Sequence, residues 1–358
     1  MTIVGARPQF IKASAVSRVI SRYEDIQEHI VHTGQHYDDN MSALFFEELQ
    51  IPAPDTHLGV GSGAHGEQTG RMLTKLEPLM QSEAPDWVLV YGDTNSTLAG
   101  ALAAAKLQIP IAHVEAGLRS FNRRMPEEIN RIMSDHLSDL LFAPTREGVA
   151  NLAREGIMGD KVLFVGDVMY DVVRHISVRL GTHLLDRLKL SEQTYIAATI
   201  HRAENTDDPM RLSAIFNGFG NVGRKIPVVL PLHPRTKARI HEFGISIPDG
   251  VILIDPLGYG DMSALVRSAA IVVTDSGGLQ KEAYFHGVPC VTLRDETEWV
   301  ELVQTGWNHL VSPVHHEAVT GGILGVLESD RPNHTDVSIY GDGNAAERIV
   351  ESILKKAS

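Results

Sequence analysis

Short runs of β-branched and other apolar residues alternate along the chain with longer segments whose apolar positions recur at helical spacing. In the first half, for example, MTIVG precedes QFIKASAVSRVISRY, and WVLVYG precedes TLAGALAAAKL. A strand followed by an amphipathic helix, repeated several times, is typical of a parallel sheet covered by helices. The pattern therefore predicts an α/β protein with a doubly wound parallel sheet.

The alternation restarts in the second half, after about residue 172, with apolar runs such as TYIAATI, IPVVLPL and AIVVTDS. The intervening segment 166–194 has helical spacing and no clear strand, so it is the predicted connection between two domains. We expect a Rossmann-like domain over 1–170 and a second one over 171–343. Residues 344–358 have the pattern of an amphipathic helix ending in lysines, and we expect it to return to the first domain.

Length and composition agree with two globular domains. The chain has 358 residues, 43% of them hydrophobic and 22% charged, and single cores rarely grow beyond about 250 to 300 residues. The net charge of −13 argues against a nucleic-acid partner, because phosphate backbones are bound by basic surfaces. A single cysteine, Cys290, fits a reducing compartment. With no apolar run of about 20 residues and no signal-peptide pattern, we expect no membrane association and a cytoplasmic location.

Polar residues that directly follow the predicted strands are the candidates for a ligand site, because ligands of open α/β sheets bind beyond the carboxyl ends of strands. The first strand leads into GARPQFIK, which puts Arg7 in a loop and Lys12 one turn into a helix. Both cations could meet a phosphate at the helix N-terminus, although a solvated surface turn would have the same sequence. No G-x-G-x-x-G or Walker A sequence occurs, which disfavours nicotinamide and P-loop chemistry.

The segment TDSGGLQKEA at 274–283 is the corresponding candidate in the second half. Ser276, Gly277 and Gly278 could present backbone amides to a diphosphate at the start of a helix. Glu282 lies one turn further on, where it could accept hydrogen bonds from ribose hydroxyls. A helix-capping turn would explain the serine and the glycines, but not the acid.

Two more strands end in histidine and arginine. TIHRAEN contains His201 and Arg202, and LPLHPRT contains His233 and Arg235. Such clusters indicate an anion site. A metal would compete for the histidines, but no H-x-x-x-H or C-x-x-C spacing occurs in these motifs, so we expect no metal.

Three acidic positions follow or flank predicted strand ends. Asp93 and Glu115 come directly after apolar strands, where a carboxylate is costly unless it has a task or a partner. Glu127 and Glu128 follow Pro126 and suit the first turn of a helix, where acids are favoured by the helix dipole. That favourable position is the ordinary explanation for the pair.

These motifs together closely resemble the non-hydrolysing UDP-N-acetylglucosamine 2-epimerase family. The resemblance extends along the whole chain and rests on the ordered set GARPQFIK, HTGQHYD, YGDTNSTLAG, HVEAGLRS, MPEEINR, GDVM, HRAEN, LPLHPRT, TDSGGLQKEA, VTLRDETEW and YGDGNAA. GARPQFIKAS, FNRRMPEEINR and TEWVELV most resemble the branch that acts on UDP-2,3-diacetamido-2,3-dideoxyglucuronate. One stretch departs: the family's common TERPE reads TEWVE, which puts Trp299 where many members have arginine.

The resemblance implies a GT-B-like fold, with two Rossmann-like domains and the nucleotide sugar in a cleft between them, and a homodimer. It implies a C2 epimerase that needs no cofactor and converts UDP-GlcNAc to UDP-ManNAc, or acts on the related diacetamido uronate, for surface polysaccharide synthesis. The mechanism it implies is elimination of UDP to a 2-acetamidoglycal followed by re-addition. The implied uridine diphosphate contacts are Arg7, Lys12, His201, Ser276, Gly277, Gly278 and Glu282, and the implied catalytic groups are Asp93, Glu115, Glu127 and His201.

A GT-B glycosyltransferase using a UDP-sugar donor is the alternative, because one fold hosts many functions. Three acidic positions beside one sugar site favour the epimerase. For a uronate substrate, Arg119, Arg123 and Arg124 are candidates to pair with the carboxylate at carbon 6, since arginine forks suit that group. A solvated basic loop is the alternative explanation of these arginines.

Overall fold

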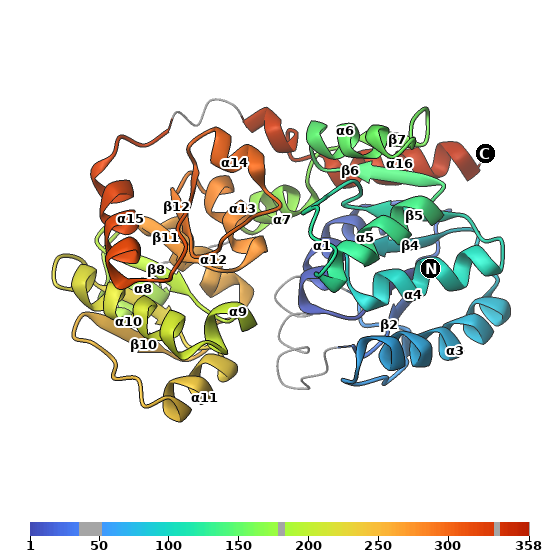
Figure 1. The fold of residues 1–358 in the computed structure, drawn as a ribbon. Coiled ribbons are helices and arrows are strands. Elements are labelled where there is room, and N and C mark those ends of the chain that lie inside the picture. The colour runs from blue at the N-terminus through green and yellow to red at the C-terminus, as the bar shows by residue number, and fades with distance from the viewer. Residues whose placement is uncertain (36–51, 178–182, 333–336, 358) are drawn as a thin grey trace. The chain divides into compact units, whose positions relative to one another are not determined.

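The computed structural model of the protein describes residues 1–35, 52–177, 183–332 and 337–357 (Figure 1). Within these residues the chain divides into two compact units. Unit 1 comprises Met1–Arg174 and Val337–Ser358, and unit 2 comprises His175–Asp336. Each unit contains one parallel sheet, so the α/β architecture predicted from the alternating pattern is confirmed.

The sheet of unit 1 has seven strands in the order β3-β2-β1-β4-β5-β6-β7. Its strands are β1 (Thr2–Val4), β2 (Ile30–His32), β3 (Thr56–His57), β4 (Val88–Tyr91), β5 (Ile111–Val114), β6 (Leu140–Ala143) and β7 (Val162–Phe164). Its helices are α1 (Arg7–Ile20), α3 (His65–Glu83), α4 (Asn95–Lys106), α5 (Pro126–Leu137), α6 (Arg146–Arg154), α7 (Val168–Ser177), which runs into unit 2, η1 (Val337–Tyr340) and α16 (Ala345–Ala357). Helix α4 packs against α3 and α5, and the C-terminal helix α16 packs against α1.

The sheet of unit 2 has six strands in the order β10-β9-β8-β11-β12-β13. Its strands are β8 (Ile196–Thr199), β9 (Val228–Pro231), β10 (Val251–Ile254), β11 (Ile271–Thr274), β12 (Cys290–Thr292) and β13 (Asn308–Leu310). Its helices are α8 (His183–Leu188), α9 (Ala203–Thr206), α10 (Pro209–Gly223), α11 (Pro234–Glu242), α12 (Tyr259–Arg267), α13 (Gly277–Phe285), α14 (Val300–Gln304) and α15 (His316–Glu328). Helix α10 packs against α15, and α12 packs against α8 and α13.

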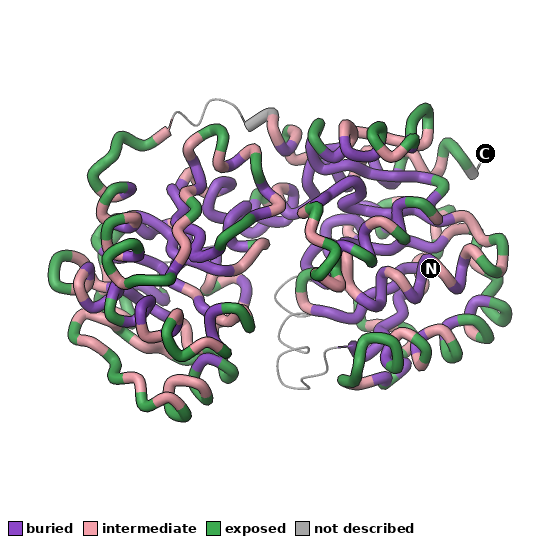
Figure 2. Tube along the Cα trace, viewed as in Figure 1, coloured by how far each residue is buried: buried purple, intermediate pink, exposed green. Residues whose placement is uncertain are grey.

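The inner strands of both sheets are buried, as the colouring of Figure 2 shows, while the edge strands β3, β7 and β10 are partly exposed. Their strands are runs of apolar residues rather than alternating ones, because a parallel sheet is covered on both faces. The small residues of α4 let this helix lie close to its sheet. A Cβ atom at Gly100 would lie 3.1 Å from Val90 Cγ1 and 3.3 Å from Ile3 Cβ, so a larger residue there would push the helix outward.

The start of α16 is held by a carboxylate of α7. Asp171 is buried, and its Oδ2 accepts a hydrogen bond of 2.7 Å from the backbone N–H of Ala346. Burial raises the pKa of the Asp171 carboxyl from 3.8 to about 6, against the lowering effect of hydrogen bonds from Ala346 and Ala345. The folded protein therefore binds this proton more tightly than the unfolded chain does.

We predict that Asp171→Asn raises the stability of the protein at neutral pH. The asparagine oxygen can still accept from Ala346, but no charge has to be buried. The wild-type contribution of Asp171 falls as the pH rises from about 4 to about 6, so the variant gains up to about 3 kcal/mol at pH 7.5 and about a third of that at pH 4.5. Urea unfolding of both proteins at the two pH values measures this difference, and a gain that did not depend on pH would contradict the assignment.

Candidate active site

The order of the strands reverses once in each sheet, and the candidate residues lie at these two reversals. In unit 1 the chain crosses from the edge strand β3 to β4, on the other side of β1, and in unit 2 it crosses from the edge strand β10 to β11, on the other side of β8. Ligands of open α/β sheets bind outside the carboxyl ends of the strands at such a switch point. Asp93 follows β4, His201 follows β8, and Ser276 follows β11, so the strand-end reasoning selected residues at both points.

Asp93 is held by helix α5. The chain leaves β4 through Gly92, whose φ of 63° lies in the left-handed region. The Asp93 carboxylate accepts hydrogen bonds from Arg131 Nη2 at 2.6 Å and Nε at 2.9 Å, and its carbonyl accepts one of 2.9 Å from Asn130 Nδ2. Sequence reasoning did not select Asn130 or Arg131. The signal was the helical spacing of MPEEINR, which puts Arg131 three residues after Glu128, on the same helix face.

Glu115, at the end of the neighbouring strand β5, is paired with a cation. It is a non-glycine residue with φ of 73°, and its side chain is buried against Lys12 of α1, whose Nζ donates to Glu115 Oε2. Gly92 makes room for this pair, because a Cβ atom there would lie 3.1 Å from the Lys12 Nζ. Backbone strain of this kind collects at functional sites. Lys12, which the motif suggested for a phosphate, thus lies beside a candidate catalytic carboxylate.

Arg7 is the first residue of α1, whereas the sequence reasoning had put it in the preceding loop. Pro8 explains the earlier start, because its fixed φ suits the first turn of a helix and its missing N–H is not needed there. The side chain of Arg7 is half-buried.

The two acids at the start of α5 have different surroundings. Glu128 is buried, and its carboxylate accepts hydrogen bonds from the backbone N–H groups of Ser120 and Phe121 and from Arg131 Nη1, each of 2.9 Å. Burial opposes its ionisation, but these hydrogen bonds outweigh it and lower the pKa of Glu128. Glu127 is exposed on the first turn. Glu128 therefore holds the loop, and Glu127 is the acid of the pair that a ligand can reach.

Further along α5, Asp135 belongs to a buried ionic cluster. His113 Nδ1 is 2.7 Å from Asp135 Oδ1, and Arg119 Nη1 donates to Asp135 Oδ2, also at 2.7 Å. Burial acts against the charge of Asp135, but His113 and Arg119 outweigh it, so the pKa of Asp135 is lowered. Arg119 also donates to Glu155. The guanidinium of Arg119 is thus committed within unit 1, while Arg123 and Arg124 are exposed.

The switch point of unit 2 is organised by Asp275, which sequence reasoning passed over. This carboxylate is fully buried at the end of β11. It accepts hydrogen bonds from the backbone N–H groups of His201 at 3.1 Å and Arg202 at 3.0 Å, and from Asn205 Nδ2 at 3.1 Å. His201 Nδ1 lies 3.4 Å from the same carboxylate, and its ring centroid is 5.6 Å from that of His233. The two histidines that the motifs suggested for an anion site are therefore neighbours.

Helix α13 begins beside Asp275, with Ser276 as its N-cap. The Ser276 N–H donates to Thr274 Oγ1 at 2.9 Å. A Cβ atom at Gly277 would lie 2.5 Å from Glu298 Oε1, whereas one at Gly278 would meet no atom within 4 Å. Glu282 is buried one turn further along.

Trp299, at the position where the motif departs from the family pattern, is buried against α13. The Lys281 Nζ lies 4.0 Å from the centroid of the Trp299 ring, and both residues are buried. This distance is typical of a cation–π contact. The tryptophan therefore packs on a helix whose first residues are candidate diphosphate contacts.

Among the described residues, no group of histidine, cysteine, aspartate and glutamate side chains is arranged to hold a metal ion. No helix of the described residues has the length and apolar character needed to cross a membrane. In the HTGQHYD motif, residues 36–38 lie outside the described residues.

Comparisons with known proteins identify one family, and the matches cover nearly the whole chain. The family model described as UDP-N-acetylglucosamine 2-epimerase matches residues 18–354. The UDP-2,3-diacetamido-2,3-dideoxy-D-glucuronate 2-epimerase of Pseudomonas aeruginosa is 51% identical, over 99% of both chains. The UDP-N-acetylglucosamine 2-epimerase of Methanocaldococcus jannaschii is 41% identical over 97% of this chain and 96% of its own. Its crystal structure with UDP-GlcNAc and UDP superimposes with a TM-score of 0.90 at 42% identity, covering 99% of each chain. The chain belongs to the UDP-N-acetylglucosamine 2-epimerase family, as its motifs predicted.

Proposed function

We propose that the protein inverts carbon 2 of a UDP-linked N-acetylhexosamine. The observation that carries the proposal is the arrangement at the switch point of unit 1, where Asp93 and Glu115 end adjacent strands and each faces a cation. The likeness of the whole chain to relatives named as 2-epimerases supports the same reaction.

The chemistry requires acid and base groups rather than a simple proton exchange. Carbon 2 of an acetamido sugar has no neighbouring carbonyl in the ring, so its proton is too weakly acidic to be removed and returned alone. In the proposed elimination, a base takes the carbon 2 proton, the C–H electron pair forms the C1–C2 double bond, and UDP leaves with the electrons of the C1–O bond. Addition of UDP to this 2-acetamidoglycal, with a proton delivered to the opposite face of carbon 2, gives the epimer.

Two faces of the sugar need at least two proton-transfer groups, and Asp93, Glu115 and Glu127 are the proposed ones. Asp93 is partly open to solvent and Glu127 is exposed, so a substrate can reach both. Glu115 is buried beside Lys12. A neighbouring cation favours the ionised form of a carboxylate, which is the form that acts as a base.

The reaction also requires that UDP be stabilised as it leaves carbon 1, and residues of unit 2 are proposed to do this. His201, Ser276, Gly277, Gly278 and Glu282 are the proposed contacts of the diphosphate and ribose, with Arg7 and Lys12 adding positive charge from unit 1. The start of α13 favours an anion because backbone N–H groups there have no partner within the helix. The proposal requires residues of both units to act on the same substrate.

For the sugar, we propose UDP-2,3-diacetamido-2,3-dideoxyglucuronate ahead of UDP-GlcNAc. The relative with that name is 51% identical, while the UDP-N-acetylglucosamine 2-epimerase of Methanocaldococcus jannaschii is 41% identical. Exposed Arg123 and Arg124, close in sequence to Glu127, are the proposed partners of the uronate carboxylate. A cytoplasmic homodimer that serves surface polysaccharide synthesis completes the proposal.

The experiment that tests the reaction is proton NMR in deuterated water, with purified protein and each UDP-sugar in turn, without metal, nicotinamide or acceptor. We expect deuterium at carbon 2 together with a manno-configured product, because the returned proton comes from solvent. Absence of exchange with both sugars, combined with sugar transfer once an acceptor is supplied, would favour the GT-B glycosyltransferase instead.

We predict that Asp93→Asn, Glu115→Gln and Glu127→Gln each lower kcat by roughly 10² to 10⁴-fold, as expected for the loss of a general acid or base. The affinity for UDP should change little in each variant, since the diphosphate contacts are mainly in unit 2. Glu147→Gln is the matched control, because Glu147 also lies in the first turn of a helix of unit 1, α6, and is exposed. Turnover assays and calorimetric titration with UDP measure the two effects.

We predict that Gly278→Ala weakens UDP binding at least about tenfold while the protein keeps its stability. The added methyl group meets no protein atom within 4 Å, but it would project toward a diphosphate bound at this helix start. Gly260→Ala is the control, because Gly260 is likewise the second residue of a helix, α12 in the same unit, and has open space at its Cβ. Equal UDP affinities for the two variants would exclude a diphosphate at α13.

A further inference from the structure

The turn after β4 is fixed by side chains from three different elements. Gln9 Nε2 of α1 donates to the carbonyl of Tyr91 at 2.9 Å. His113 Nε2 of β5 lies 2.7 Å from the carbonyl of Gly92, and Asn130 Nδ2 of α5 donates to that of Asp93 at 2.9 Å. Three consecutive carbonyls are thus held, which sets the direction in which Asp93 leaves the strand.

His113 is the member of this set that connects the turn to Asp135. The Gly92 carbonyl can only accept, so the Nε2 atom carries a proton. The other ring nitrogen, Nδ1, is 2.7 Å from Asp135 Oδ1, and the ionised carboxylate can also only accept. The fully buried ring therefore bridges the Gly92 carbonyl and the Asp135 carboxylate.

The second oxygen of Asp135 reaches the turn that carries Glu115. Asp135 Oδ2 accepts from the backbone N–H of Gly117 at 3.1 Å and from Arg119 Nη1 at 2.7 Å. This turn is strained at Glu115, a non-glycine residue with φ of 73°. At Gly117, where φ is 81°, only glycine fits, because a Cβ atom would collide with the carbonyl of Gly148. A conformation of this kind persists only where the surroundings determine it.

We propose that Asp135 is a positioning residue that holds the two acid-bearing turns, at Asp93 and at Glu115, in one fixed relation. One carboxylate oxygen acts on the Asp93 turn through His113, and the other acts on the Glu115 turn through Gly117 and Arg119. The inference rests on the proposed function, in which these two carboxylates transfer protons at carbon 2.

The geometry of the reaction makes such a connection useful. Two groups that act on one carbon must keep their separation and direction, and a displacement of about 1 Å can cost roughly 10²-fold in rate. Asp135 itself is fully buried, so it touches no substrate. Its effect must therefore appear in kcat and in the motion of both turns, and not in UDP binding.

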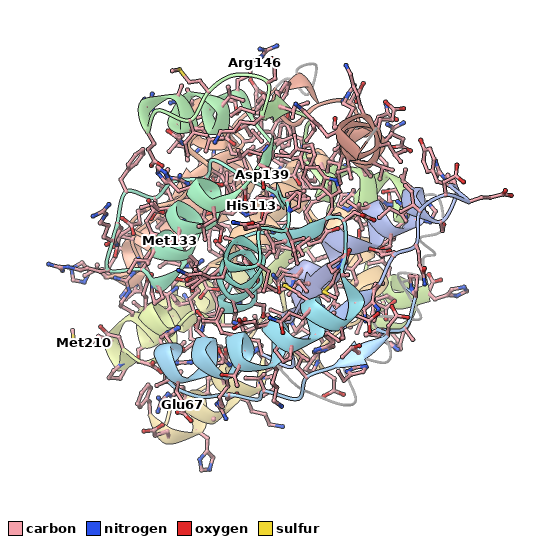
Figure 3. The ribbon with its side chains drawn as sticks, turned by 90° about the vertical axis from the view of Figure 1, so that its right-hand side faces the viewer. Glu67, His113, Met133, Asp139, Arg146 and Met210 are labelled. Carbon is pink, nitrogen blue, oxygen red and sulfur yellow. The ribbon has the colours of Figure 1, made fainter. Side chains whose placement is uncertain are left out.

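The test is Asp135→Asn, with Asp139→Asn as the matched control. Asp139 lies four residues further along (His113 and Asp139 are labelled in Figure 3). Like Asp135, it accepts a hydrogen bond from a backbone N–H, but its donor is Ile111, at 2.9 Å and at the amino end of β5. We expect Asp135→Asn to lower kcat by about 10²-fold, with KM and UDP affinity changed less than threefold. Hydrogen exchange of the amides 92–94 and 115–117 should rise in Asp135→Asn only.

His113→Gln tests the connection to the Asp93 turn separately from the connection to the Glu115 turn. It is also the variant to use if Asp135→Asn does not fold. It removes the imidazole ring but leaves Asp135 bonded to Gly117 and Arg119, so exchange should rise at 92–94 and stay unchanged at 115–117. An exchange increase confined to one turn in Asp135→Asn, or a kcat within threefold of the control, would overturn the proposal. If the wild-type protein turns over neither sugar, the proposed function fails, while the exchange pattern still decides whether Asp135 joins the turns.

Discussion

A buried carboxylate at each switch point must be neutralised inside the protein, and this requirement shapes the loops around both candidate sites. Asp275 in unit 2 and Asp135 in unit 1 are fully buried. A charge in such a place is tolerated only when hydrogen-bond donors and opposite charges surround it. Asp275 gathers the N–H groups of His201 and Arg202, and Asp135 gathers His113, Gly117 and Arg119. The loops that carry the candidate residues are thus the partners of these charges.

Two of the three carboxylates proposed to react, Asp93 and Glu127, have a different environment from those that hold the fold, whereas Glu115 is buried beside Lys12. Asp93 and Glu127 are reachable from solvent, whereas Glu128 and Asp135 are buried and bonded to several donors at once. A structural carboxylate is best kept ionised, and the donors around Glu128 and Asp135 have this effect. Both kinds meet on α5, which carries Glu127 on its exposed face and Glu128, Arg131 and Asp135 on its buried one.

The departure at Trp299 also has a physical consequence. Trp299 does not leave a gap at the arginine position of the family pattern, because its ring is buried and covers the ammonium group of Lys281. The cation that contacts the Trp299 ring is therefore Lys281 of α13 itself. The Arg294–Glu298 ion pair of 3.0 Å beside it is also buried. These contacts keep the segment packed on the helix where the diphosphate is proposed to bind.

The alternating apolar runs determined both sheets and which residues lie at the strand ends, because local periodicity records which faces are buried. Asp93, Glu115, His201 and Ser276 could be selected in this way, and the ordered motifs identified the family. The resemblance also selected Glu127. Only the tertiary structure showed that Glu128 is buried and holds a loop, paired Lys12 with Glu115, and assigned Asp135 and Asp275 their central positions. The partners of these residues are up to 103 positions away in sequence. Such pairs form through packing of distant elements, which a local pattern does not record, so their roles were decided by the fold.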